Sequence, residues 1–168
     1  MDLQDVKTPG LSCDLHDNPD IKERKLALSH KILMSVEKPA RYIGGESGSV
    51  IKDKEKVSVR FAFCFPDSYD IGMSHLGMKI LYSLTNQRED YWCERVFAPG
   101  TDFEEIMRRE NIPLYALESL DPVKDFDFIG FTMQYELSYT NVLNMLDLAG
   151  LPVFAKDRGD ELFNIVVA

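Results

Sequence analysis

Cysteine is scarce in this sequence, with only Cys13, Cys64 and Cys93 among 168 residues. An odd number of widely spaced cysteines forms neither a disulfide framework nor a CxxC metal pair. The first ten residues, MDLQDVKTPG, contain no apolar segment of the kind that a secretory signal requires. Together these absences predict a cytoplasmic protein with reduced thiols.

Long apolar runs and a surplus of positive charge are missing as well. No stretch approaches the roughly 18 apolar residues of a membrane-spanning helix, so we expect no membrane partner. The formal net charge is −9, whereas a nucleic-acid-binding surface needs a basic patch or stripe, so we expect no nucleic-acid partner. Hydrophobic residues make up 45% and charged residues 28%, which is ordinary for a globular domain.

The stretch from Val57 to Leu84 organises the rest of the chain. Val57 to Phe65 is rich in β-branched and aromatic residues and predicts a buried strand, which ends at Pro66-Asp67. After a short polar loop the period changes to that of an amphipathic helix. One face of this helix carries Met73, Leu76, Gly77, Ile80, Leu81 and Leu84. Strand, loop and helix form the first half of a βαβ unit.

Further strands and helices alternate along the remaining sequence. We expect strands at 92–98, 112–117, 126–133 and 163–168, and helices at 101–110 and 138–149. Thr101 and Glu104 match a capping box at the start of the first of these helices. In this helix Phe103, Ile106 and Met107 are expected to face inward. The alternation predicts an α/β fold with a doubly wound, mainly parallel sheet, Rossmann-like or flavodoxin-like.

The first 50 residues are predicted to form an N-terminal arm with one helix and a glycine-rich turn. Residues 1–20 show little periodicity, and residues 21–37 have a helical pattern that Lys38-Pro39 ends. The turn around Gly44, Gly45 and Gly48 could hold a phosphate or carboxylate, or simply pack against the domain; it lacks the GxxxxGK[ST] pattern of a phosphate-binding loop. Residues 51–168 are predicted to form the Rossmann-like domain. Because the sequence ends on an apolar strand, we expect that domain to be incomplete at its C-terminal end.

Polar side chains gather where two of the predicted strands end. Ligands of open α/β sheets bind at such strand ends, where loops from neighbouring strands meet. The loop after the first strand and the loop after strand 126–133 therefore form the candidate site for a flat polar ligand. Its residues are Asp67, Tyr69, Asp70, Gly72, Ser74 and His75 from the first loop and Gln134, Tyr135, Glu136, Ser138 and Asn141 from the second.

Each of these residues also has a purely structural interpretation. His75 could coordinate a metal or move a proton, or it could serve the first turn of its helix. Asp70, Ser74 and Ser138 could cap helices, and Glu136 could be a catalytic carboxylate or a solvated loop acid. A dinucleotide site is disfavoured because the first turn, PDSYDIGMSHLG, lacks GxGxxG.

Four long strings resemble the N-terminal region of a family of bacterial radical SAM proteins. They are KPARYIGGE, VRFAFCFPDSYDIGMSHLGMKILY, WCERVFAPG and GFTMQYELSYTNVLNMLDLAG, and the resemblance runs from about Lys38 to Ala168. Members of this family, often labelled Fe-S oxidoreductases, carry a cobalamin-binding-like domain before the radical SAM barrel. The resemblance implies that this chain is the accessory domain and that the barrel of the same polypeptide is its partner.

The resemblance also implies cofactors and their places. The parent protein would carry a 4Fe-4S cluster and S-adenosylmethionine in the barrel, outside this chain, because the chain has no CxxxCxxC motif. Cobalamin is the implied ligand of the accessory domain, with Gly77 and Thr132 added to the candidate site. The family's DxHxxG pattern is altered, since Met73 stands two residues before His75 and Gly77 two residues after it. A different ligand, a base-off cobalamin, or a domain that only docks on the barrel as a scaffold therefore remain open.

Overall fold

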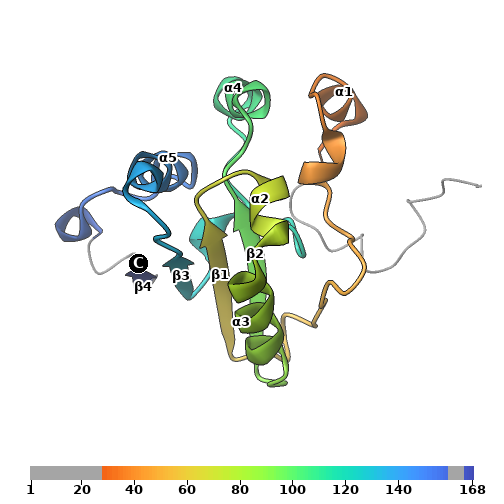
Figure 1. Ribbon diagram of the computed structural model, residues 1–168, viewed down its shortest axis with the longest axis vertical. Coiled ribbons are helices and arrows are strands. Elements are labelled where there is room, and N and C mark those ends of the chain that lie inside the picture. Colours follow the sequence, from red (N-terminus) through yellow and green to blue (C-terminus); the bar gives the residue numbers. More distant parts are fainter. Residues whose placement is uncertain (1–27, 159–164) are drawn as a thin grey trace, which may run out of the picture.

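A computed structural model describes residues 28–158 and 165–168 (Figure 1). The expected arm at 1–20 and most of the expected helix at 21–37 lie outside the described residues. The described part of that helix is α1, His30–Leu33, which begins after the N-cap Ser29. A 3-10 turn, η2 (Pro39–Tyr42), follows it.

Four strands form one parallel sheet in the order β2-β1-β3-β4. They are β1 (Val59–Phe65), β2 (Tyr91–Phe97), β3 (Phe128–Phe131) and β4 (Ile165–Val167). The chain first steps from β1 to β2 and then returns across β1 to β3, so the direction of winding reverses between β1 and β3. This confirms the expected doubly wound α/β fold and places the topological switch point between these two strands.

Helices connect the strands on both sides of this switch point. The connection from β1 to β2 holds α2 (Tyr69–Ser74) and α3 (Leu76–Asn86), and α4 (Thr101–Glu110) follows β2. The connection from β3 to β4 holds α5 (Tyr139–Leu148) and the turns η4 (Glu136–Ser138) and η5 (Ala155–Asp157); the turn η3 (Val123–Asp125) precedes β3. Figure 1 shows α4 and α5 near each other and apart from α3.

Three sequence expectations about these elements are wrong. The helix expected over residues 73–84 is two helices, because His75 has extended backbone angles (φ −77°, ψ 112°) between them. Gly100, not Thr101, is the N-cap of α4, so there is no capping box at that position. Residues 112–117 form no strand of the sheet; Tyr115 makes only one isolated bridge, with Pro122.

The segment after α4 instead covers the free edge of β2. The Leu117 amide donates to the Arg95 carbonyl (2.9 Å), and the Arg95 amide donates to the Glu118 carboxylate (2.7 Å). An exposed edge strand invites pairing with other chains, and this segment prevents it at β2. Leu120 has a positive φ of 56° within the tight turn that follows.

The core lies on both faces of the sheet. Its largest fully buried hydrophobic side chains are Trp92, Phe103, Met107, Phe126, Ile129 and Met145. The inward side of α4 agrees with the sequence, since Phe103, Ile106 and Met107 are all buried. No helix among residues 28–158 and 165–168 is long and apolar enough to cross a membrane.

Helix α3 packs on the sheet through Met78 and Tyr82. The apolar face that the sequence pattern marks is not the face that packs. Four side chains of that apolar face have about half or more of their area exposed: Leu76 (70%), Ile80 (49%), Leu81 (52%) and Leu84 (54%). We call these four residues the α3 flank. An apolar patch of this kind marks a contact surface in many soluble proteins.

Candidate functional site

The loops after β1 and β3 lie side by side at the switch point and are hydrogen-bonded to each other. The Tyr135 hydroxyl donates to the Asp67 carboxylate (2.8 Å), and the Asn141 amide donates to the Pro66 carbonyl (2.9 Å). At the strand ends, the Thr132 amide donates to the Cys64 carbonyl (3.1 Å). The neighbouring position of the two loops, expected from the sequence, is confirmed.

The first loop owes its path to Asp67 and Gly72. Asp67 accepts from the Ser68 amide (2.6 Å), and Ser68 is the N-cap of α2. Gly72 is buried, and a Cβ there would lie 2.2 Å from the Phe97 ring, so only glycine lets α2 approach β2 this closely. Gly72 is thus required for packing.

Asp70, Tyr69 and Ser74 contact residues outside the second loop. Asp70 forms ion pairs with Arg41 and, at 3.5 Å, with Lys38; the hydrogen bond from Arg41 lowers the pKa of Asp70. The Tyr69 ring meets Phe97 edge-on, and burial raises the pKa of Tyr69 to about 12. The Ser74 hydroxyl donates back to the Asp70 carbonyl (2.8 Å) and caps no helix.

His75 is the N-cap of α3. Its Nδ1 accepts a hydrogen bond from the Met78 amide (3.1 Å), and its ring lies against Phe65. A neutral imidazole that accepts at Nδ1 carries its proton on Nε2, so neither nitrogen offers a free lone pair to a metal. Gly77 lies beside the ring, where a Cβ would come within 3.0 Å of His75 Cε1.

The second loop exposes apolar and polar side chains together. Met133 (41%), Tyr135 (45%), Leu137 (81%) and Tyr139 (50%) are exposed, and we call these four residues the strand-end platform. Gln134 and Glu136 are exposed beside them. Ser138 is buried and donates to the Tyr135 carbonyl (2.7 Å), which holds the loop rather than capping α5 through its side chain.

Thr132 presents a polar atom without a partner at the end of β3. Its Oγ1 is buried and makes no hydrogen bond with any described residue. Buried hydroxyls are rarely left unpaired, because an unsatisfied polar atom costs about 1–3 kcal/mol. Among the candidate residues, Thr132 therefore gives the clearest sign of a missing partner.

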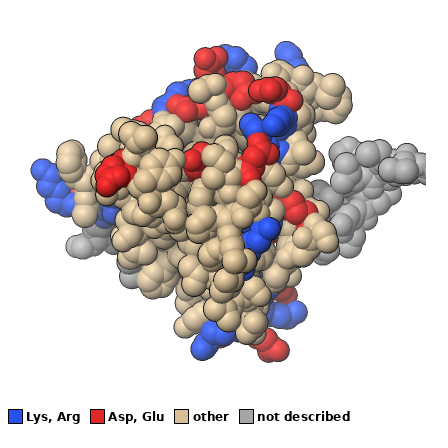
Figure 2. All heavy atoms as spheres, in the orientation of Figure 1, with Lys and Arg blue, Asp and Glu red and all other residues tan. Residues whose placement is uncertain are grey.

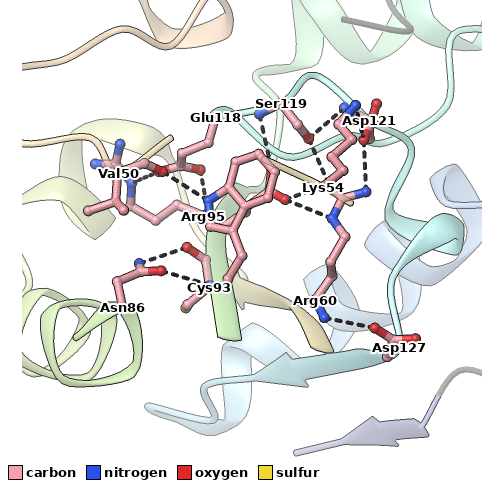
Figure 3. A network of polar contacts seen from close by, with 12 residues as sticks. Val50, Lys54, Arg60, Asn86, Cys93, Arg95, Glu118, Ser119, Asp121 and Asp127 are labelled. Carbon is pink, nitrogen blue, oxygen red and sulfur yellow. Dashed lines mark hydrogen bonds and ion pairs between the residues drawn. The ribbon is translucent and has the colours of Figure 1, made fainter. Parts of the chain in front are cut away.

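A buried ionic cluster lies on β2 and was not found from the sequence (Figure 3). Arg95 donates from Nε to Glu118 (2.6 Å) and from Nη2 to Glu46 (2.9 Å) and Ser49 (2.8 Å). Burial raises the pKa of Glu118 to about 7. Glu94 and Arg95 are adjacent in the otherwise apolar strand β2, and two neighbouring charges form no periodic pattern that a sequence analysis could detect. Glu46 and Glu118 are distant from Arg95 in the sequence and meet it in the folded chain.

Arg60 forms a second buried cluster on the neighbouring strand. It contacts Glu94 (2.5 Å) and Asp121 (2.8 Å), and Lys54 adds a further ion pair to Asp121 (2.8 Å) (Figure 3). The guanidinium also lies over the Phe126 ring, 4.2 Å from its centre. Every charge in this cluster has an opposite partner, so it ties the segment after α4 to the sheet.

The described residues offer no metal centre. No group of three or more His, Cys, Asp or Glu side chains in residues 28–158 and 165–168 could hold a metal ion. Cys64 and Cys93 are free and buried, and burial raises the pKa of both thiols. Cys13 lies outside the described residues. The thiols of Cys64 and Cys93 are therefore core groups without nucleophilic character.

Comparison with known proteins identifies the family. The family described as "Radical SAM proteins, N-terminal" matches residues 77–168, which is more than half of the chain. No match was found among curated proteins or among solved structures. The family match confirms the radical SAM part of the resemblance, while its cobalamin-binding part stays a prediction. The chain belongs to the family of N-terminal regions of radical SAM proteins.

Proposed function

We propose that this chain is an accessory domain that holds a corrinoid or a substrate against the radical SAM barrel of the same polypeptide. The family match supports the accessory role. The catalytic equipment of such a protein, a 4Fe-4S cluster and S-adenosylmethionine, would belong to the barrel.

The strand-end platform carries the proposal. It lies at the switch point of the sheet, where α/β proteins bind ligands. Its two tyrosine rings, Tyr135 and Tyr139, and the exposed Leu137 offer apolar area, and the exposed Gln134 and Glu136 offer polar contacts beside them. A flat ligand with a polar edge, such as a corrin ring, fits this combination.

Ligation of cobalt by His75 does not fit the residues present. Nδ1 is engaged with the Met78 amide, and losing that bond would uncap α3. Removal of an N-cap costs about 0.5–2 kcal/mol. A corrinoid on this domain would therefore be bound without His75 as a ligand.

Titration with hydroxocobalamin tests this proposal. We expect saturable binding by absorbance and co-elution in size exclusion, weakened by Leu137→Asp, which adds a charge to the platform. His75→Asn keeps an N-cap side chain and should leave binding unchanged; the matched surface control is Arg109→Asp on α4. Binding abolished by His75→Asn would contradict the proposed mode, and binding insensitive to Leu137→Asp would contradict the platform.

An exposed apolar part of the sheet, beside α3 at β3 and β4, favours a second candidate, a scaffold that docks on the barrel without holding a ligand. His75 against Phe65 and Tyr82 against Arg95 place α3 on one face of the sheet. By register, Phe128 and Val167 lie on this same face, and they are 36% and 48% exposed. Figure 2 shows the molecule in the orientation of Figure 1, and most of the surface seen there belongs to residues other than Lys, Arg, Asp and Glu.

Charge substitutions on the α3 flank test whether the chain docks on the barrel through that surface. A scaffold predicts that Ile80→Arg with Leu84→Arg lowers the melting temperature of the protein that carries both domain and barrel. The same pair of changes should leave the melting temperature of the 168-residue chain almost unchanged, because both side chains are about half exposed. An unchanged melting temperature in the longer protein would exclude docking through the α3 flank.

A further inference from the structure

We infer that a hollow beside Arg95 is a second binding site, for the carboxylate of a small organic acid. The hollow has a volume of about 350 Å³. Its walls come from the turn at Ser47-Gly48, the end of α2, the inner side of α3, and β2. It contains no residue of the loop after β3, so it is separate from the strand-end platform.

The shape of the hollow suits a small molecule. Its volume lies at the lower end of the roughly 300–1,000 Å³ of known ligand pockets. Met73, Met78 and Tyr82 form apolar walls, and Lys79, Ser83 and Ser47 bring polar groups to its lining. Gly48, with φ +87°, leaves the space beside it open, since a Cβ there would meet no atom within 4 Å.

One donor of Arg95 is poorly satisfied at this hollow. Nε and Nη2 bind oxygen atoms of Glu118, Glu46 and Ser49, but the one acceptor that Nη1 has among the described residues is the Met73 sulfur, at 3.1 Å. A thioether is a weak acceptor, and the methionine side chain is flexible enough to move aside. A carboxylate oxygen in its place would form a charge-assisted hydrogen bond, about twice as strong as a neutral one.

Each further negative charge at the hollow needs a cation to pair with, and Lys79 can supply one. Glu118 and Glu46 already face the Arg95 guanidinium, so a doubly charged phosphate would meet both carboxylates without a matching cation. Lys79 adds one positive charge at the lining, and it makes no ion pair with any described residue. A monocarboxylate with a short apolar body meets both the cationic and the methionine-lined parts of the hollow.

Titration of the 168-residue chain with butyrate tests the inference, with butyramide as the neutral ligand of equal size. We expect butyrate to bind with a dissociation constant on the order of 1 mM, a normal value for so few atoms. The Arg95 side-chain NH resonances should shift in ¹⁵N spectra. Butyramide should bind at least about tenfold more weakly, because its amide oxygen can accept a hydrogen bond from the guanidinium but carries no negative charge.

Three variants on α3 locate the site without disturbing the buried ion pairs of Arg95. Ser83→Phe fills the mouth of the hollow and should abolish binding, while Leu84→Phe on the α3 flank is the matched control and should bind as the parent chain does. Lys79→Gln should weaken binding about threefold to fivefold. Absence of butyrate binding by a folded chain, equal binding of butyramide, or full binding by Ser83→Phe would each overturn the inference.

Discussion

Replacing Glu118 by alanine should destabilise the fold more than any other single change to a charged side chain on the edge of β2. Glu118 is fully buried and accepts from both the amide (2.7 Å) and the Nε (2.6 Å) of Arg95. Without it, the Arg95 amide loses its acceptor and the guanidinium keeps only Glu46 as an anionic partner. Removing one member of a buried ion pair costs about 3–5 kcal/mol.

Urea unfolding followed by circular dichroism measures this cost. The exposed Glu105 on α4 gives the matched control, and Glu105→Ala should change the free energy of unfolding by less than about 0.5 kcal/mol. Glu118→Gln keeps the shape and one acceptor, so its cost should fall between the two. If Glu118→Ala cost less than about 1 kcal/mol, the edge of β2 would not depend on this carboxylate, and the structural role assigned to the cluster would be refuted.

Three further predictions concern the same sheet and its loops. Burial raises the pKa of Glu118 from 4.5 to about 7, so the folded state binds this proton more tightly than the unfolded state does. The free energy of unfolding of the parent chain, compared with that of Glu118→Gln, should therefore fall as pH rises from about 4.5 to 7. Parallel pH profiles of the two proteins would contradict this. Gly72→Ala should cost about 1–3 kcal/mol and lower the urea midpoint, because its Cβ would lie 2.2 Å from the Phe97 ring. Tyr135→Phe removes the bond to Asp67 and should speed amide exchange in the second loop while the urea midpoint stays unchanged.

The sequence predicts the sheet well because its strands carry strong local signals. β1 and β3 are nearly continuous apolar runs, and their period differs clearly from that of the helices between them. The same signals place the loops after these strands at one edge of the sheet, and the Tyr135–Asp67 bond confirms that they meet. Fold class and the position of the candidate site therefore follow from local pattern and from the rules of parallel sheets.

What the sequence cannot predict depends on long-range contacts. The pattern of residues 112–117 suits a strand, yet the segment bonds to the edge of β2 through a side-chain carboxylate and a single backbone bond. The apolar flank of α3 has the period of a core-facing surface, yet the helix packs through Met78 and Tyr82. His75 looks like a ligand in the sequence, but the break between α2 and α3 gives it a capping role. The Arg95 hollow needs residues from four separate segments and leaves no motif.

Photo-cross-linking from the strand-end platform tests the proposed function most directly. A photoreactive residue at position 137, in the protein that carries both this domain and the radical SAM barrel, should cross-link to the barrel. The same residue at position 109, exposed on α4, should not. Cross-links from position 109 but not from position 137 would show that the barrel meets another surface, and would contradict the role proposed for the platform.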